Sequence, residues 1–384
     1  MRACGVAAVK ASSAACSAQH AALRLCYVHC YRAPHFIRTD AQLEALRECP
    51  EIEVRVIRNR HRGAFRYVEL LLELWRSRRA RHPDVYLLGF RGHEIFWLLW
   101  LFARPTPIVI DALMSPSFAL IEERKAGAAG RALGFALLRL ERQILKKADL
   151  VLTDTTAHAR WYSERFGIPP ESIVAIPVGA RIIDPRLDAV AAFDGTTMHV
   201  LFYGSFLPLH GIDVILEAAA SVQDLPFQFD FIGGSAANMR WLRKRCATLG
   251  IRRYTHRRWV PFEDLSRHDI ARTHICLGGP FGGTPQSQRV ITTKTIQCIA
   301  QGKPTIIGAV SCNEGFVDRV NCLIVPQRDP TALASALRWC YGHPEQLQQI
   351  GRHASRLYGE RFSAPSIAAP LSAALHQCAH RHRA

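Results

Sequence analysis

The chain has 384 residues, of which 49% are hydrophobic and 21% charged, so we expect a folded globular protein of two domains and exclude a disordered one. The formal net charge of +17 favours an anionic ligand or surface, but no zinc-finger, homeodomain or RNA-recognition pattern occurs, so nucleic acid is not predicted as the partner. The longest apolar stretch, residues 95–103, is far shorter than the roughly 20 residues of a membrane-spanning helix, and no segment is expected to cross a bilayer.

The first half of the chain repeats a strand–helix pattern. Residues 1–22 are too weakly apolar for a signal peptide, and we expect a flexible extension there. The apolar segments predict strands at 23–31, 53–57, 85–88, 107–111, 150–153 and 173–177. The amphipathic or aromatic segments predict helices at 40–49, 65–81, 95–102, 118–147 and 157–166. This alternation indicates a parallel, doubly wound sheet, and we assign residues 23–178 to one Rossmann-like domain.

Residues 179–198 lose this periodicity and are predicted to be a linker. A second series over 199–361 has predicted strands at 199–203, 227–232, 256–260, 274–277, 304–308 and 322–325. Its helices are expected at 212–222, 236–249, 263–271, 291–301, 330–342 and 344–358. Residues 362–384 are expected to form a C-terminal helix or tail. The predicted fold class is α/β, with two Rossmann-like domains facing a cleft, and ligands of such sheets bind at the carboxyl ends of the strands.

Two strand-to-helix turns of the second series, within 199–217 and 274–308, are rich in Gly and Pro. Turns of this kind present backbone N–H groups to an anion, so the pair suggests one nucleotide-diphosphate site. Arg289 and Lys294 flank a helix start, where the helix dipole favours an anion, although a solvated basic face is the alternative. His210 is predicted to contact the diphosphate and to be protonated beside it, unless it is only a surface turn residue.

Several motifs occur in an order that resembles the retaining glycosyltransferases of family 4, which have the GT-B fold. The motifs are Phe202–Gly211, Gln288–Lys294, Gly302–Pro304 and Asn321–Pro326 followed by Asp329-Pro330, with weaker matches at 89–94, 148–154 and 176–179. The resemblance is strongest over 199–361 and weaker over 23–178. It implies transfer of a sugar from a nucleoside diphosphate sugar to a hydroxyl, without a metal or cofactor. It also implies that a donor phosphate oxygen takes the proton of the acceptor hydroxyl.

The sequence departs from the commonest family pattern at the donor site. Ser205 and His210 stand where the family has Arg and Lys, and Arg289 and Gln297 stand in place of its Glu-x7-Glu pair. We interpret the chain as a branch in which phosphate binding has moved to the second turn, onto Arg289 and Lys294. Gln297 is then predicted to bind a ribose hydroxyl, or else to pack within its helix. The predicted donor-binding residues are Gly204, Ser205, His210, Gly211, Gly282, Gly283, Thr284, Arg289, Lys294 and Gln297.

Candidate acceptor-side residues follow two strands of the first domain. Arg91, His93 and Glu94 come after the strand 85–88, and Asp111 ends the strand 107–111. Both strand ends are expected to face the cleft. The family often has a catalytic histidine after the second of these strands, and this chain lacks it. His93 and Asp111 are therefore the candidate catalytic residues, with Arg91 and Glu94 on the acceptor side. Arg32 and Arg38 are candidates to reach the donor phosphates.

We therefore predict a cytoplasmic glycosyltransferase, peripheral on the inner face of the membrane, whose acceptor is a lipid-linked sugar in surface polysaccharide synthesis. An inactive donor-binding partner subunit and a GT-B-type sugar-nucleotide epimerase stay open as alternatives. Three tryptophans with neighbouring arginines are a candidate membrane-surface patch, although two of the tryptophans also fit the core. They are Trp75, Trp97 and Trp100, with Arg76, Arg78, Arg79, Arg81 and Arg104.

The twelve cysteines form no Cys-x-x-Cys pair, and several lie in apolar segments, so we expect buried, reduced thiols. The C-terminal stretch His376–Arg383 contains three histidines without a complete ligand pattern. It is expected to be a free tail, and no metal site is predicted.

Overall fold

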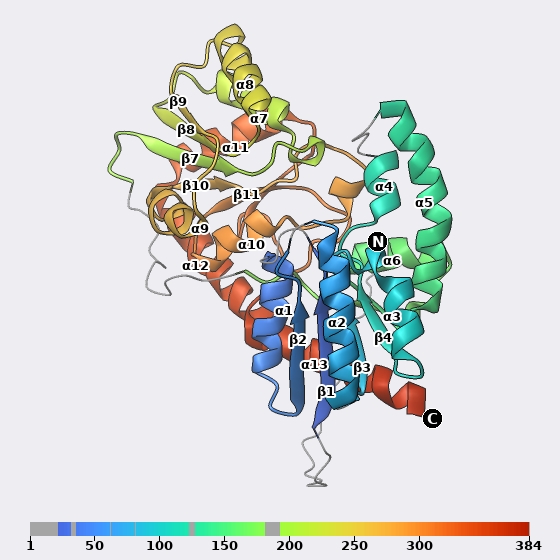
Figure 1. Ribbon diagram of the computed structural model, residues 1–384. Helices are drawn as coiled ribbons and strands as arrows, with labels where there is room; N and C mark the ends of the chain where they lie inside the picture. The colour runs from blue at the N-terminus through green and yellow to red at the C-terminus, as the bar shows by residue number, and fades with distance from the viewer. Residues whose placement is uncertain are drawn as a thin grey trace, which may run out of the picture.

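The computed structural model describes residues 22–31, 36–61, 63–80, 82–122, 127–180 and 193–383. It has two lobes, each built on one six-stranded parallel sheet (Figure 1). The N-terminal sheet has the strand order β2-β1-β3-β4-β5-β6, and the C-terminal sheet has the order β12-β11-β10-β7-β8-β9. The predicted α/β class with two Rossmann-like domains is confirmed.

The four central strands of the N-terminal sheet are almost wholly buried, as expected where helices cover both faces of a parallel sheet. Its strands are β1 (Leu23–His29), β2 (Ile52–Arg58), β3 (Val85–Leu88), β4 (Ile108–Asp111), β5 (Leu150–Thr153) and β6 (Ile173–Ala175). Its helices are α1 (Ile37–Arg47), α2 (Phe65–Ala80), α3 (Phe96–Ala103), α4 (Pro116–Ile121), α5 (Gly127–Lys147) and α6 (Thr156–Phe166), with short 3-10 turns η1 (Gly92–Glu94) and η2 (Pro170–Ser172).

The C-terminal lobe repeats the arrangement. Its strands are β7 (Met198–Tyr203), β8 (Phe227–Ile232), β9 (Tyr254–Arg257), β10 (Ile275–Leu277), β11 (Thr305–Gly308) and β12 (Leu323–Val325). Its helical segments are η3 (Pro208–His210), α7 (Ile212–Ser221), α8 (Ala236–Thr248), α9 (Phe262–Asp264), η4 (Leu265–Ile270), η5 (Gln286–Gln288), α10 (Thr293–Ala300), α11 (Pro330–Gly342) and α12 (Pro344–Arg361). The chain ends in α13 (Ala364–Arg383).

Most predicted elements are present with boundaries shifted by a few residues, but one predicted helix was wrong. The helix predicted over 118–147 is two helices, α4 and α5. Helix α4 begins earlier because the Ser115 side chain caps it and Pro116 supplies a preset first-turn φ. The strand predicted at 256–260 begins two residues earlier, as β9, where it pairs with β8.

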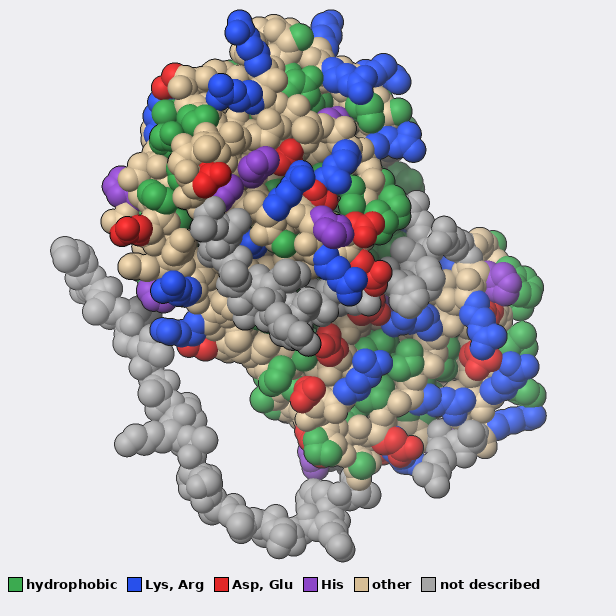
Figure 2. Space-filling view, turned by 90° about the vertical axis from the view of Figure 1, so that its left-hand side faces the viewer, with side chains coloured by type: hydrophobic (Ala, Val, Ile, Leu, Met, Phe, Trp, Pro, Cys, Tyr) green, Lys and Arg blue, Asp and Glu red, His purple; other side chains and the backbone are tan. Residues whose placement is uncertain are grey.

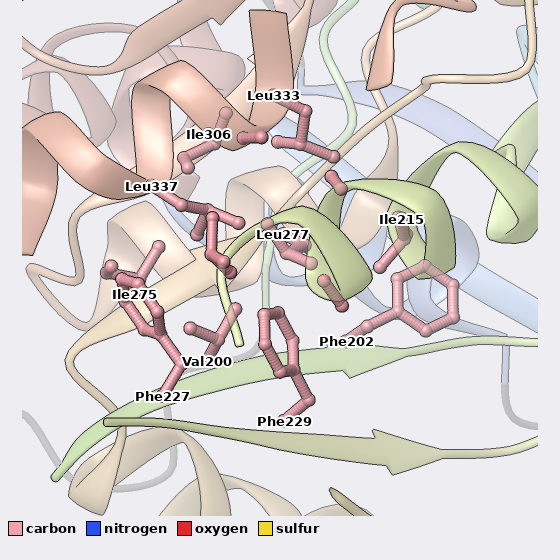
Figure 3. Packing of buried hydrophobic residues seen from close by; sticks show 14 of the residues in the cluster. Val200, Phe202, Ile215, Phe227, Phe229, Ile275, Leu277, Ile306, Leu333 and Leu337 are labelled. Atoms are coloured by element: carbon pink, nitrogen blue, oxygen red, sulfur yellow. The ribbon is translucent and has the colours of Figure 1, made fainter. Parts of the chain in front are cut away.

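The core of the C-terminal lobe lies between its sheet and helices α7 and α11. Figure 3 shows Phe202, Phe227 and Phe229 from the strands in one cluster with Leu333 and Leu337 from α11, and each is at most 1% exposed. Burying one such side chain contributes about 1.5–3 kcal/mol. This packing positions β7 and β8, and thereby the turns at their carboxyl ends.

Helix α13 returns to the N-terminal lobe, behind whose strands it passes in Figure 1. It packs on α1, and Ile367, Leu371 and Leu375 join the core formed by β1 and α1. The prediction of a free tail over 376–383 was therefore wrong, because the helix continues to Arg383 with an apolar face buried. The last helix of the chain links the two lobes.

Among the helices that the structure describes, none is both long enough and apolar enough to pass through a bilayer. The described cysteines are all free thiols, and all but Cys312 are buried. The predicted extension, apart from residue 22, and residues 181–192 of the predicted linker lie outside the described residues.

Candidate functional site

The two Gly-rich turns of the C-terminal lobe lie against each other, after β7 and after β10. The amide of Gly282 donates a hydrogen bond to the carbonyl of Leu209 at 3.0 Å. A Cβ on Gly211 would lie 2.6 Å from the carbonyl carbon of Phe281, and one on Gly282 would lie 1.9 Å from the carbonyl oxygen of Pro208, so glycine is required at both positions. The structure thus joins the two segments that were predicted to form one site.

Lys294 is buried beside this junction. Its side chain extends from the first turn of α10, and a Cβ built on Gly204 would lie 3.4 Å from its Nζ atom. The ammonium lies 4.5 Å from the centroid of the Phe202 ring, and no hydrogen-bond partner for Nζ exists in the described part of the chain. Burial lowers the pKa of Lys294 to about 7. Because a buried ammonium without a partner is costly, an anion would bind favourably at this point.

The ring of His210 lies next to the same turn, since a Cβ on Gly204 would be 3.0 Å from its Cε1 atom. Nδ1 accepts a hydrogen bond from the amide of Leu207 at 3.3 Å, which leaves Nε2–H as the donor of a neutral ring. Burial, and then the charge of Lys294, lower the pKa of His210 to about 2. In the ligand-free protein His210 therefore offers a neutral donor, and its contact with a diphosphate and its protonation beside that anion stay predictions.

Gln297, one turn further along α10, is also buried. Its Oε1 atom accepts a hydrogen bond from the Tyr203 hydroxyl at 2.9 Å, and its Nε2 atom has no partner among the residues the structure describes. Gln297 is therefore packed inside the lobe. This agrees with the alternative prediction, in which Gln297 packs within its helix and does not bind a ribose. The ribose contact stays a prediction, for which the unpaired Nε2 donor is available.

An open pocket of about 500 Å³ lies at the carboxyl ends of β7, β8 and β9. Gly204 and the exposed Ser205 form one wall, and the start of α8 and the loop after β9 form the others. Its volume falls within the range of small-molecule sites. The polar and aromatic side chains that line it are Tyr203, Ser205, Ser235, Asn238, Arg258 and Trp259.

Gly283 and Thr284 build the loop that leads to Arg289. The Gly283 amide donates to Gln327 at 3.0 Å, and Gly283 has a φ of 62°, which favours glycine. The Thr284 hydroxyl accepts a hydrogen bond from the amide of Ser287 at the start of η5. These contacts give the two residues a structural role, and direct contact with a donor stays a prediction.

Arg289 crosses from the C-terminal lobe to the N-terminal lobe. Its guanidinium pairs with Glu122 at 3.1 Å and lies 4.3 Å from the ring centroid of Trp161, and its side chain is 14% exposed. Its carbonyl accepts a hydrogen bond from the Thr155 hydroxyl at 2.6 Å. Arg289 therefore faces the space between the lobes, but it is held by a carboxylate, and Lys294 is the unpaired cation at the turns.

Sequence reasoning missed Asp154 and His158, which lie where Arg289 meets the N-terminal lobe. The His158 Nδ1 atom is 2.7 Å from an Asp154 carboxylate oxygen, and both side chains are buried. His158 lines an interlobe crevice with Ser115, Trp161 and Arg289. The crevice has a volume of about 10 Å³, roughly that of one water molecule. The signal in the sequence was a carboxylate and a histidine four residues apart at a strand-to-helix turn.

The prediction that Asp111 faces the cleft was wrong. Its carboxylate is fully buried and pairs with Arg38 at 3.0 Å. Arg38 also donates to the carbonyl oxygens of Thr153 and Pro177, at 3.0 and 2.9 Å. The pair therefore ties α1 to the ends of three segments, and neither Asp111 nor Arg38 is open to a substrate. Arg32 lies outside the described residues.

His93 is also turned inward, which corrects its prediction as a cleft-facing catalytic residue. Its side chain is 7% exposed, and its Nε2 atom lies 4.0 Å from the Glu141 carboxylate. Neither ring nitrogen makes a hydrogen bond within the described ranges. Burial lowers the pKa of His93 to about 4, so the ring that faces Glu141 is neutral at pH 7.

Arg91 and Glu94 lie at the end of β3, beside the start of α2. Glu94 accepts hydrogen bonds from Arg66 and Tyr67 at 2.8 and 2.9 Å, and it pairs with Arg91 at 2.9 Å. The side chains of Arg91 and Glu94 are 37% and 25% exposed. The cluster is accessible, and its acceptor-side role stays a prediction. In the described part of the chain, no three His, Cys, Asp or Glu residues are grouped so that they could hold a metal ion.

Both lobes match models of known protein families. Residues 8–179 match the glycosyl transferase 4-like domain, and residues 197–343 match the glycosyl transferases group 1. D-rhamnosyltransferase WbpZ of Pseudomonas aeruginosa is 25% identical over 166 residues, which are 43% of this chain and 41% of the relative. D-inositol 3-phosphate glycosyltransferase of Geodermatophilus obscurus is 27% identical over 270 residues, which are 64% of this chain and 57% of the relative. The chain thus covers about half the length of these relatives.

The fold is shared with solved structures. Sucrose-phosphate synthase from Thermosynechococcus elongatus superposes with a TM-score of 0.70 at 17% identity, over 92% of this chain and 98% of the other. Anabaena HepE in complex with UDP-glucose gives a TM-score of 0.68 at 13% identity, over 92% of this chain and 100% of the other. Likeness at these identities establishes the architecture of the two lobes.

Proposed function

Because the chain belongs to the group 1 glycosyltransferases and has their GT-B fold, we propose that it moves a sugar from a nucleoside diphosphate sugar to a hydroxyl acceptor, with retention at the anomeric carbon. The observation that carries the donor assignment is the unpaired ammonium of Lys294 at the junction of the two Gly-rich turns. The adjacent pocket of about 500 Å³ would hold the nucleoside. The solved complex of HepE with UDP-glucose supports this assignment by analogy of fold.

The chemistry proposed for this site is stabilisation of the leaving diphosphate. As the glycosidic bond breaks, negative charge grows on the phosphate oxygen that bridged to the sugar. Lys294 and the Nε2–H of His210 are already in place to meet that charge, so little reorganisation is needed during the reaction. These side chains and the start of α10 act without a divalent metal or cofactor in this proposal.

For the acceptor we propose a lipid-linked sugar in surface polysaccharide synthesis, reached at the cytoplasmic face of a membrane. Helix α2 supports this because Phe65, Val68, Leu72 and Trp75 recur at intervals of three and four residues and are 46–58% exposed. The guanidinium of Arg79 lies 3.7 Å from the Trp75 ring centroid. An apolar stripe bordered by cations is suited to an anionic lipid surface.

The position of α2 also supports this acceptor. Arg66 and Tyr67, in its first turn, contact Glu94 at the end of β3, so the apolar stripe begins beside the acceptor-side cluster. Lys and Arg side chains are spread over both lobes of the face shown in Figure 2, in keeping with the net charge of +17. Trp97 and Trp100, which were candidates for the same surface, are partly buried against the N-terminal core.

The proposal is tested by incubating the purified chain with a panel of UDP-, GDP- and ADP-sugars carrying a radiolabelled sugar, together with a membrane extract. The expected result is transfer of label to the lipid fraction with one donor. Donor binding without turnover would replace the proposal with an inactive donor-binding subunit. Conversion of the donor into an isomeric sugar nucleotide would replace it with an epimerase.

A further inference from the structure

Helix α5 carries exposed cations without exposed acids. Its cations, all on the solvent side, are Arg131, Arg139, Arg142, Lys146 and Lys147. The one acidic residue of the helix, Glu141, is 3% exposed and accepts hydrogen bonds from Ser115 and Ser117. Arg131 and Arg139 form no hydrogen bond or ion pair with any residue that the structure describes. Their charge is therefore available to an anionic partner.

The same solvent side of α5 is also apolar. Leu133, Phe135 and Leu140 are 55%, 53% and 42% exposed. Leu133 and Leu140 are seven residues apart, so they line one edge of this side. Phe135 lies on the other edge, four residues from both Arg131 and Arg139. Large apolar side chains that gather on one exposed surface mark an interaction site.

Helices α2 and α5 cover the same face of the N-terminal sheet. Leu74 of α2 and Leu145 of α5 are buried in one core cluster with Leu88 of β3. Leu87, the preceding residue of β3, belongs to the cluster on the opposite face. In Figure 1, α5 forms the outer edge of the lobe on the right. The apolar stripe of α2 and the solvent side of α5 therefore both point away from the same face of the sheet.

Turn η1 contacts both helices and contains the acceptor-side residue Glu94. The Glu94 carboxylate accepts hydrogen bonds from Arg66 and Tyr67 of α2. His93, the preceding residue, lies 4.0 Å from Glu141 of α5. A flat surface that touched both helices would therefore pass beside the acceptor-side cluster at the end of β3.

We infer that α5 is a second membrane-binding element, and that the N-terminal lobe rests on an anionic bilayer through α2 and α5 together. This inference rests on the proposed transfer to a lipid-linked acceptor. Arg131 and Arg139 lie among the lipid headgroups, and the apolar side chains enter the boundary between headgroups and acyl chains. A soluble polyanion would use the cations alone. The exposed Leu133, Phe135 and Leu140 are the reason for assigning a bilayer instead.

The test uses the full chain and vesicles of equimolar phosphatidylglycerol and phosphatidylcholine, without donor or acceptor. One double variant, Arg131→Gln with Arg139→Gln, removes two charges. A second, Leu133→Gln with Leu140→Gln, removes the apolar edge. All four side chains are exposed, so the fold should tolerate these changes, and circular dichroism checks this. Binding is measured by co-sedimentation at several salt concentrations.

The matched control removes the same charge from the other lobe. Arg240→Gln with Arg243→Gln changes two exposed arginines of α8. Both α5 variants should bind vesicles at least about tenfold more weakly than wild type, and the α8 variant should bind within about twofold. Wild-type binding should weaken as salt is added.

Two results would overturn the inference. The first is unchanged binding of the α5 arginine variant, or a loss that the α8 variant matches, because net charge alone would then explain it. The second is undiminished binding of the leucine variant, which would replace the bilayer with a soluble acidic partner.

Failure of the proposed function is distinguishable, because vesicle binding requires neither donor nor turnover. If no sugar reaches the lipid fraction but vesicle binding still needs α5, the membrane face is supported and only the reaction is wrong. If sugar is transferred and the α5 variants bind vesicles like wild type, only the inference fails. In an active chain, the α5 variants should raise the KM for the lipid-linked acceptor in vesicles at least severalfold, with donor affinity unchanged within about twofold.

Discussion

The ammonium of Lys294 lies 4.5 Å from the centre of the Phe202 ring, at the place where the two Gly-rich turns of the C-terminal lobe meet. The face of an aromatic ring partly offsets the loss of water around a cation, but it does not neutralise it. The site therefore contains a positive charge that the described protein residues leave unpaired, and a bound diphosphate would supply the missing partner.

Replacing Lys294 with Met is expected to weaken binding of the nucleoside diphosphate sugar by about 1.5–3 kcal/mol, the range of a hydrogen bond to a charged group. The free energy of unfolding should stay the same or rise, because a buried, unpaired ammonium is removed. Calorimetric titration and denaturant unfolding measure the two effects. Lys303→Met is the control: Lys303 donates to the Ala271 carbonyl, so its loss should lower stability without changing donor affinity.

Donor affinity should decrease as the pH rises above about 7. The free Lys294 ammonium has a pKa of about 7, and a bound diphosphate favours the charged form, so binding above that pH requires uptake of a proton. The dissociation constant should rise by up to tenfold per pH unit until the pKa of the bound form is reached. Titrations between pH 6 and 9 test this, and a dependence that persists in Lys294→Met would assign the proton to another group.

Glu122 is expected to compete with the donor for Arg289. The two side chains are 14% and 17% exposed and lie 3.1 Å apart, so Glu122→Gln should free the guanidinium and tighten donor binding by about 2–10-fold. Arg289→Ala should weaken it. The double variant decides whether the two effects share a cause, because Glu122→Gln should have no effect once Arg289 is absent. Equal gains in both backgrounds would contradict the competition.

Breaking the buried Arg38–Asp111 pair should destabilise the fold without altering chemistry in the folded protein. Asp111→Asn leaves an uncompensated guanidinium that is 1% exposed, and we expect a loss of about 3–5 kcal/mol in the free energy of unfolding. Glu73→Gln, which disrupts an exposed pair with Arg76, is the matched control and should cause little change. If Asp111→Asn instead unfolds like wild type but no longer turns over, Asp111 is a catalytic residue after all.

The apolar stripe of α2 should be required for binding to anionic vesicles. Leu72→Asp and Trp75→Asp place charges on side chains that are 49% and 46% exposed, so the fold should tolerate them while vesicle binding is lost. Co-sedimentation with vesicles of phosphatidylglycerol and phosphatidylcholine measures this. Trp259→Asp, at an exposed tryptophan of the other lobe, is the control. Undiminished sedimentation of both α2 variants would rule out this face.

The sequence predicted the architecture well because local signals agreed with the global fold. Apolar segments set the strands, and glycines in the two turns are required by close backbone contacts, such as that between Gly282 and Pro208. Side-chain direction was harder to predict. Asp111 was expected in the cleft, but a partner 73 residues away holds it inside the lobe.

Long-range pairing also explains the remaining differences at the site. Arg289 was recognised as a cation near the donor, but its partner Glu122 is 167 residues distant and has no sequence signature. The low pKa of His210 in the ligand-free protein could not be predicted from sequence, because its burial and its proximity to Lys294 depend on the packing of two turns. Asp154 and His158 carried a readable local signal, since the two residues are four apart at a helix start.

A crystal structure of the chain with the nucleoside diphosphate of the selected donor tests the central claim most directly. The account predicts a phosphate oxygen within about 3 Å of the Lys294 Nζ atom, with the nucleoside in the pocket formed by Ser205, Asn238 and Trp259. A diphosphate bound elsewhere, with Lys294 still unpaired over the Phe202 ring, would contradict it.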